Sequence, residues 1–396
     1  MNGDSEKLVY MDHAATTPLR SEALEDMLPY LQGSFGNPSS LYTLAQEARN
    51  AVDRSRRTIA SLIGARSSEL TFTSGGTESD NAAIKGGAMA MRHLGRHIIT
   101  SAIEHHAVLH TCHQMEQFGF EVTYLPVDQY GLVSESDLLN AVTSETILVS
   151  IMMANNEIGT IQPISELSES IQSVSRRDGR TILFHTDAVQ AAPWTDLQPL
   201  TISSELLSLS SHKIAGPMGI GALYVRPGLD LPPFVRGGGQ QGGRRGGTEA
   251  TALIVGFGAA CARTQAIRDE SVVRVAGLRD RLEATLLDSI EGARRNGSES
   301  RLPNTCHMSF AHCDGNVLVA RLDLDGVSAS AGAACASGVA ETSPVIDALR
   351  LPAKYSAGSL RLSLGYETTE SDVDRAIHAI PNAVHAVRES GLEATR

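Results

Sequence analysis

Short β-rich runs alternate with helical patterns between residues 70 and 225, and this alternation leaves few folds open to the chain. The runs lie at residues 70–73, 97–100, 122–126, 147–152, 182–185, 206–209 and 222–225. Apolar residues recur with helical spacing at residues 44–63, 78–92, 105–118 and 164–174. Strands that alternate with helices are typical of βα units. We therefore predict an α/β fold whose large domain holds a mostly parallel seven-stranded sheet flanked by helices.

A glycine-rich segment at residues 236–247 interrupts this alternation, and a long helical pattern follows it. Further elements come later in the chain, with strands near 307–310 and 359–364 and helices near 317–322 and 372–387. They predict a small α+β domain at the C-terminal end. The expected division is an N-terminal segment 1–20 that packs with the small domain, a large domain 21–260 and a small domain 261–396.

Charge and cysteine content narrow the class of protein. The 33 Lys and Arg against 45 Asp and Glu give a net charge of -12, which argues against direct binding to nucleic acid or to an anionic membrane. The five cysteines are odd in number and lack CxxC spacing, so neither a disulfide framework nor a zinc knuckle is expected. Neither a signal peptide nor a membrane-spanning stretch is visible. We expect a cytoplasmic protein whose partners are proteins and small molecules.

Residues 71–81, with the sequence TFTSGGTESDN, predict a strand that turns through residues 74–77 into a helix. Backbone N–H groups and the helix dipole would converge there on a phosphate, and Gly75 and Gly76 would allow it to approach closely. We call residues 74–77 the cradle. The alternative is a plain strand-turn-helix in which Ser74 or Thr77 caps the helix.

Two further residues fit a phosphate-bearing aldehyde. Asp187 follows a predicted buried strand, where a carboxylate needs a cation or hydrogen bonds, although it could simply cap a helix. Lys213 follows a histidine and precedes three glycines, Gly216, Gly219 and Gly221. Because glycine has no side chain, the backbone there could pass close to a bound ligand. An imine-forming lysine, an aspartate for a pyridinium nitrogen and a phosphate cradle together indicate pyridoxal 5'-phosphate.

Seven motifs, in order along the chain, carry a resemblance to a known family. They are YMDHAATTP at 10–18, FGNPS at 35–39, TSGGTESDN at 73–81, EH at 104–105, NNEIGT at 155–160, SSHK at 210–213 and SAGAACAS at 330–337. With them the chain resembles the cysteine desulfurases of the NifS/IscS kind. These belong to the class V aminotransferases and have the fold-type I architecture of pyridoxal-phosphate enzymes.

The resemblance implies a set of cofactor-binding residues. Lys213 would hold pyridoxal 5'-phosphate through an imine and later carry the substrate α-proton, while His105 would stack on the ring and assist. Asp187 would keep the ring nitrogen protonated. The remaining implied contacts are Gln190 and Asn156 near the phenolic oxygen, and Gly76, Thr77, Ser210 and His212 at the phosphate, with Thr248 reaching the phosphate of a second subunit in a homodimer. Asn155 is the alternative to Asn156.

The resemblance also implies how the substrate L-cysteine is handled. Arg361 would clamp the substrate carboxylate with help from Asn37, a bidentate task that suits guanidinium. Cys335 lies in a small-residue segment that we expect to be a mobile loop. As a thiolate it would take the substrate sulfur as a persulfide and pass it to an acceptor protein. The other cysteines, Cys112, Cys261, Cys306 and Cys313, are expected to be small buried hydrophobes.

Two departures from the family pattern leave questions open. Gly242 stands in the glycine-rich segment where many relatives have arginine, and Arg244 or Arg245 would compensate. The chain also ends soon after the predicted helix 372–387, without the tail by which housekeeping relatives dock an iron–sulfur scaffold. The acceptor could therefore serve iron–sulfur assembly, tRNA thiolation or DNA phosphorothioation.

Other activities remain as alternatives at this point. Selenocysteine lyase would use the same residues on a different chalcogen. A class V aminotransferase would need no loop cysteine, so the motif around Cys335 argues against it. A binding platform with a structural cofactor is disfavoured by the joint presence of lysine, histidine, carboxylate clamp and cysteine.

Overall fold

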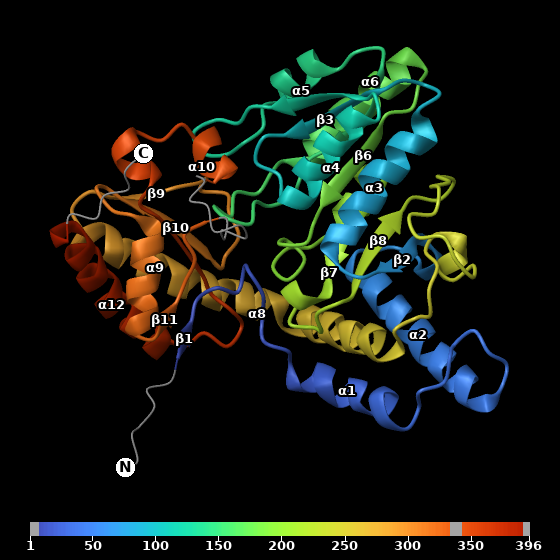
Figure 1. Cartoon of the computed structure of the whole chain (residues 1–396), viewed down its shortest axis with the longest axis horizontal. Coiled ribbons are helices and arrows are strands. Elements are labelled where there is room, and N and C mark those ends of the chain that lie inside the picture. The colour runs from blue at the N-terminus through green and yellow to red at the C-terminus, as the bar shows by residue number, and fades with distance from the viewer. Residues whose placement is uncertain (1–7, 333–342, 391–396) are drawn as a thin grey trace.

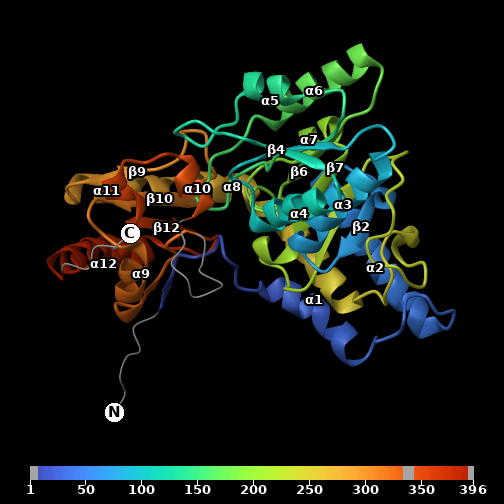
Figure 2. The same ribbon diagram turned by 45° about the horizontal axis from the view of Figure 1, so that its top comes forward.

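The computed structural model describes residues 8–332 and 343–390, which form a large part built on a sheet and a smaller part beside it (Figures 1 and 2). Among these residues, seven strands join in the order β2-β8-β7-β6-β5-β3-β4. Their bounds are β2 Leu70–Thr73, β3 His97–Ser101, β4 Glu121–Leu125, β5 Thr146–Ser150, β6 Leu183–Asp187, β7 Leu206–Ser210 and β8 Gly221–Val225. Strand β8 pairs antiparallel with both β2 and β7, and the other strand pairs described in this sheet are parallel. The predicted mostly parallel seven-stranded sheet is confirmed.

Helices cover the sheet as βα units require (Figure 1). The predicted helices are present as α2 Thr43–Leu62, α3 Gly76–Met91, α4 His106–Gln117 and α6 Ile164–Asp178. Three other described helices of the large part were not predicted from the sequence, α1 Ser21–Gln32, α5 Glu135–Ala141 and α7 Gln198–Ser203. Two of these are shorter than two turns and α1 contains Pro29, so none of them shows a long uninterrupted apolar stripe.

The smaller part combines a short sheet with two main helices. Strand β10 pairs antiparallel with both β12 and β9, and β1 pairs in parallel with β11. The bounds are β1 Val9–Tyr10, β9 Ala293–Arg295, β10 Thr305–Phe310, β11 Val327–Ser328, β12 Ser359–Ser363, α9 Gly315–Leu324, α10 Pro344–Ala348, α11 Ala353–Ser356 and α12 Glu370–Glu389. The β1–β11 pair therefore ties the N-terminal segment to the smaller part.

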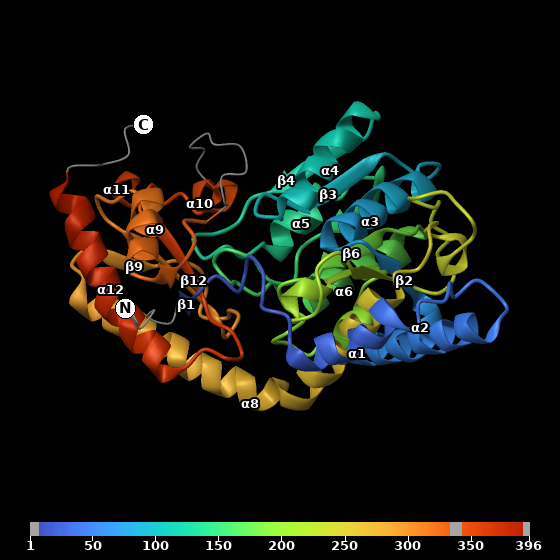
Figure 3. The ribbon, with the colours of Figure 1, turned by 60° about the horizontal axis from the view of Figure 1, so that its bottom comes forward.

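Helix α8, Thr251–Ser289, connects the two parts as one continuous helix (Figure 3). It packs on α1 and α2 at its beginning and on α12, β9 and β10 toward its end. The predicted division at residues 260 and 261 falls inside this helix. The long helical pattern predicted after the glycine-rich segment corresponds to this helix.

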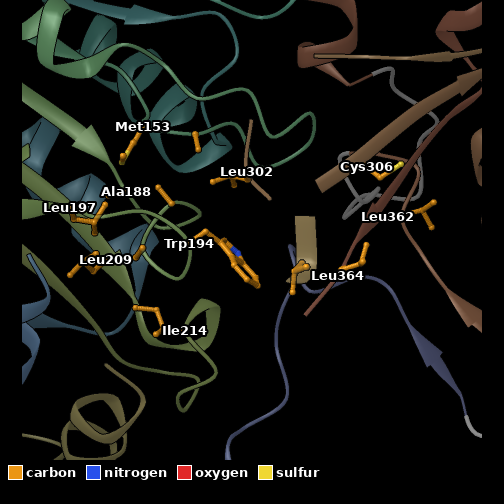
Figure 4. Packing of buried hydrophobic residues seen from close by; sticks show 14 of the residues in the cluster. Met153, Ala188, Trp194, Leu197, Leu209, Ile214, Leu302, Cys306, Leu362 and Leu364 are labelled. Atoms are coloured by element: carbon orange, nitrogen blue, oxygen red, sulfur yellow. The ribbon is translucent and has the colours of Figure 1, made fainter. Parts of the chain in front are cut away.

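A continuous hydrophobic core runs from the large sheet to the smaller part. Trp194, in the loop after β6, extends toward Leu364 beyond β12 (Figure 4). The free cysteines that the structure describes are all buried, as predicted, namely Cys112, Cys261, Cys306 and Cys313. None of the described helices is long and apolar enough to cross a bilayer.

Candidate active site

A cavity of about 370 Å³ lies where the ends of β6 and β7 approach the start of α3 and strand β12. Its lining contains most of the residues that the sequence analysis singled out. They are Gly76, Thr77, His105, Asn156, Asp187, Gln190, Ser210, His212, Lys213 and Arg361. Because ligands of open α/β sheets bind at the carboxyl ends of the strands, this is the expected position for a site.

The cradle contributes Gly76 and Thr77 to the wall of the cavity. Helix α3 begins after Gly75, and no side chain caps it, so the first N–H groups of the helix keep their hydrogen-bonding capacity. Neither Ser74 nor Thr77 is therefore the cap that the alternative interpretation required. A Cβ on Gly76 would lie 2.9 Å from a methyl of Val189 and 3.5 Å from Cβ of Ser210. Glycine thus keeps the helix start open to an anion.

Lys213 follows β7 and reaches across the cavity to the N-terminal segment. Its Nζ donates hydrogen bonds to the carbonyl oxygens of Ala14 at 2.5 Å and Ala15 at 2.7 Å. Burial, followed by the nearby Arg361 guanidinium, lowers the pKa of Lys213 to about 8. A usable fraction of this amine is therefore neutral near pH 7, as attack on a carbonyl carbon requires.

Asp187 ends β6 and is 6% exposed. Its Oδ1 accepts a hydrogen bond of 2.8 Å from the Val189 N–H, yet burial raises the pKa of its carboxyl to about 6. Asp80, 1% exposed, is a neighbouring carboxyl whose pKa is raised well above its ordinary value by burial and then by Asp187. Asp80 therefore keeps its proton, and Asp187 is the member of the pair that ionises for a cation in the cavity.

The histidines of the cavity are neutral at pH 7. Burial, then the charge of Lys213, lowers the pKa of His105 to about 4, and the same two causes lower the pKa of His212 to about 4. A ring nitrogen of His105 accepts a hydrogen bond of 3.1 Å from the Ala107 N–H, so His105 also caps α4. The neutral ring is consequently held in place beside the cavity.

Arg361, on β12, is 5% exposed and held by two partners. One terminal nitrogen donates to the Asn156 carbonyl at 2.9 Å, and the other donates to Asp12 at 2.7 Å. Nε of Arg361 and Oδ1 of Asn156 are buried without a hydrogen-bond partner among the described residues. Both residues line the cavity, so these atoms are available to a ligand.

The structure separates the two adjacent asparagines. The side chain of Asn155 is fully buried and bonded to the Ile103 carbonyl and to the N–H groups of Glu157 and Ile158. Asn156 instead lines the cavity. Asn155 thus shapes the turn, and Asn156 faces the cavity.

Three predicted site residues are not brought into the cavity by the described chain. Asn37 and Thr248 are exposed and do not contribute to its lining. Cys335 lies outside the described residues, but Gly332 and Pro344 on either side of it both line the cavity. The roles of these three residues remain predictions.

Three buried acids that were given no role from the sequence also line the cavity, namely Asp80, Glu104 and Glu157. Burial raises the pKa of Glu104 to about 8, although Ser101 and the Met152 N–H both donate to it. Glu157 accepts a hydrogen bond of 2.6 Å from Ser343, a residue that follows the segment of Cys335. In the sequence, only the position of these three acids inside the motifs at 73–81, 104–105 and 155–160 pointed to the site.

Residues 9–376 match the family described as aminotransferase class-V. The chain belongs to the class V aminotransferases. The chain is 48% identical to a protein of Methanosarcina thermophila named cysteine desulfurase IscS, over 383 residues that cover 96% of this chain and 93% of the relative. The resemblance predicted from the motifs is therefore confirmed.

Solved structures agree with this assignment. A NifS-like protein superposes with a TM-score of 0.89 at 34% identity, covering 96% of this chain and 100% of the other. A structure described as SspA in complex with cysteine gives a TM-score of 0.78 at 35% identity, covering 91% and 99%. The predicted fold class is thus confirmed, and with the family comes its cofactor, pyridoxal 5'-phosphate.

The residues of the cavity fit this cofactor. The cradle offers backbone donors and a glycine surface to a phosphate, Lys213 offers a partly neutral amine to an aldehyde, and Asp187 offers an ionisable carboxylate to a ring nitrogen. The unpartnered oxygen of Asn156 adds an acceptor for the ring substituents.

Proposed function

We propose that this protein is a cysteine desulfurase, which converts L-cysteine to L-alanine and transfers the sulfur first to Cys335 and then to an acceptor protein. The single observation that carries the proposal is the convergence of Lys213, Asp187 and Arg361 on one cavity whose wall also includes Gly332 and Pro344, on either side of Cys335. The names of the similar proteins support the same activity.

The cofactor would be held by the cradle, Ser210 and His212 at its phosphate, by Lys213 at its aldehyde carbon and by Asp187 at its ring nitrogen. When bound, pyridoxal phosphate withdraws electrons from the α-carbon of an amino acid. The ionised Asp187 favours a protonated ring nitrogen, because a buried carboxylate gains most from a cation beside it. Neutral His105 can lie against the ring without adding a competing charge.

The substrate would be placed by its carboxylate and handled by two side chains. The free Nε edge of Arg361 would bind the carboxylate from the cavity wall. The neutral amine of Lys213 would remove the proton from the substrate α-carbon, since its lowered pKa of about 8 suits a base near neutral pH.

Sulfur transfer balances without an external oxidant. The Cys335 thiolate would attack the substrate sulfur, so that an S–S bond forms and the Cβ–S bond breaks. The electron pair of the broken bond stays with the carbon fragment, which takes up a proton and leaves as L-alanine. Cys335 is left as a persulfide, in which the transferred sulfur is ready for a thiol of the acceptor.

The proposal extends to assembly and location. We propose a homodimer in which Thr248 reaches the phosphate site of the second subunit, since Thr248 is exposed in the single chain and lies outside the lining of its own cavity. The negative net charge favours a protein as sulfur acceptor over direct contact with nucleic acid. We place the reaction in the cytoplasm. Sedimentation equilibrium of the holoenzyme tests the dimer and should give twice the mass of one chain. A Thr248→Val variant tests the role of Thr248 and should retain less cofactor than wild type.

The activity is tested by incubating the cofactor-loaded protein with L-cysteine and thiol while alanine and sulfide are measured. Wild type should form both in equal amounts, and mass spectrometry without thiol should find one extra sulfur on Cys335. Cys335→Ala should abolish sulfide formation, whereas the matched control Cys313→Ala, at a buried position in the smaller part, should not. Unchanged sulfide and alanine formation by Cys335→Ala would refute the persulfide route.

A further inference from the structure

A second cavity, of about 280 Å³, shares Lys213 and Gln190 with the active site but has its own lining. The segment before α1, the loop after β6, the turn after β12 and one face of α8 surround it. It therefore lies at the junction of the large and smaller parts. Apart from the two shared residues, the proposed reaction uses none of the side chains in its lining.

Two aromatic rings form one wall of this cavity. Trp194 and Tyr366 stack with their ring centroids 4.6 Å apart and an angle of 25° between the rings. The Tyr366 hydroxyl donates a hydrogen bond of 2.6 Å to the Pro193 carbonyl, which fixes the ring. Figure 4 shows the Trp194 side chain directed toward the smaller part at Leu364. The wall is thus rigid and joins both parts of the chain.

Arg20, a partly buried residue, stacks on this wall, and two of its nitrogens lack hydrogen-bond partners among the described residues. Its central carbon is 4.3 Å from the centre of the Tyr366 ring. Its Nε and one terminal nitrogen, Nη2, are buried and have no hydrogen-bond partner among the described residues. Because unsatisfied buried donors are costly, these two nitrogens call for an acceptor. Nε and Nη2 form the edge of guanidinium that binds two oxygens of one carboxylate.

The other charged groups around the cavity leave this edge of Arg20 free. Glu22 is engaged by Arg263, with 3.2 Å between its Oε1 and Nε of the arginine, and by Ser21. Glu367 is exposed at the rim and provides no hydrogen bond to either buried nitrogen. Burial lowers the pKa of His13 to about 4, so that this ring is neutral at pH 7.

The start of helix α1 adds donors of the same kind. Arg20 is the N-cap residue of α1, and no side chain caps the helix there. The first N–H groups of α1 and the positive end of its dipole therefore remain available to an anion beside Arg20. Ser21 and Glu22, the first two residues of the helix, are both part of the cavity lining.

We propose that this cavity binds a small carboxylate, held side-on by Arg20 against the Trp194–Tyr366 wall. The inference goes beyond the proposed function and does not depend on it, because it uses no step of the reaction. An occupant would connect the segment before α1 to the turn after β12, and it would share a wall with the active site at Lys213 and Gln190.

The test uses the fact that Trp194 is the only tryptophan in the sequence. Tryptophan fluorescence of the cofactor-loaded protein is followed during titration with sodium propionate, a carboxylate without an amine, at constant ionic strength. Wild type should give a saturable change. Arg20→Gln should weaken binding at least about tenfold, because two charge-assisted hydrogen bonds are lost. Arg20→Lys, which keeps the charge but not the fork, should weaken it by a smaller factor.

Two control variants separate binding in this cavity from binding elsewhere on the protein. Arg281→Gln changes an exposed arginine of α8 that pairs with Asp374, so it should bind propionate like wild type. Arg361→Gln removes the proposed carboxylate clamp of the active site and should also keep the response. Thermal melting of each variant shows whether it is folded. If Arg20→Gln does not fold, Arg20→Lys replaces it as the binding-deficient variant.

The inference is overturned by any of three results. The first is no saturable change in wild type, and the second is a change that persists in Arg20→Gln at unaltered affinity. The third is a change that disappears in Arg361→Gln while it survives in Arg20→Gln, because propionate would then occupy the active site. Titration with inorganic phosphate forms a further arm: saturation by phosphate but not by propionate would refute the choice of a carboxylate.

Discussion

Replacing Gly221 by alanine should displace the cradle and weaken cofactor binding. A Cβ on Gly221 would lie 2.6 Å from the Leu209 carbonyl oxygen and 2.7 Å from both Cα and the carbonyl carbon of Gly75. Carbon atoms in contact prefer about 3.5–4.0 Å, so Gly75 would have to move by about 1 Å. All three neighbours are backbone atoms, and no side-chain rotation can relieve the contact.

The size of the effect follows from this overlap. Overpacking of this kind costs about 1–3 kcal/mol. The entropy of unfolding of a chain of 396 residues is about 0.8 kcal/mol/K at Tm, so Tm should fall by roughly 1–4 °C. If about 1.4 kcal/mol of the cost falls on the moved cradle, the Kd for pyridoxal phosphate rises about tenfold. Differential scanning calorimetry gives Tm, and titration of the cofactor-free protein gives Kd.

The matched control is Gly277→Ala, an exposed glycine in the middle of α8 where a Cβ would meet nothing within 4 Å. Alanine is favoured over glycine in a helix interior by about 1 kcal/mol, so this variant should melt slightly above wild type and bind the cofactor equally well. The reasoning is refuted if Gly221→Ala has the Tm and the cofactor affinity of wild type.

Three further predictions concern the active site. Asp187→Asn should lower kcat/KM by about 10²–10³-fold while the protein still binds cofactor, because the amide oxygen can accept a hydrogen bond from the Val189 N–H but carries no charge. Steady-state kinetics measure the activity and alkaline release measures the bound cofactor. Full activity would contradict the role assigned to Asp187. Arg361→Gln should raise KM for L-cysteine about 10–100-fold with a smaller change in kcat, and a change in kcat alone would argue against a carboxylate clamp. The rate at which cofactor-free protein binds pyridoxal phosphate should rise with pH through a midpoint near pH 8 and level off above about pH 9, because burial lowers the pKa of Lys213 from 10.5 to about 8 and only the neutral amine attacks. Asp12→Asn removes an anion that raises this pKa and should move the midpoint to lower pH, whereas a wild-type midpoint near 10.5 in stopped-flow absorbance would contradict the burial of Lys213.

The large sheet could be predicted from the sequence because the signals for its strands are local. Each predicted strand is a short apolar run between turns, and β2 begins and ends at the predicted residues. Asp187 and Lys213 were found because each follows such a run directly, at the edge of the sheet where ligands bind. Helices α5 and α7 were not predicted, because their seven and six residues are too few to show a helical period.

What the sequence determined by itself is therefore the order of strands and helices, the motifs and the family, since these depend on residues close together in the chain. The tertiary structure alone decided which side chains meet. Arg361 is held by Asp12, 349 positions away, and Asp80 shares a buried environment with Asp187. The orphaned donors of Arg20 are likewise visible only once Tyr366 lies beneath them. Burial and charge pairing act through space, so folding creates these properties and no local pattern records them.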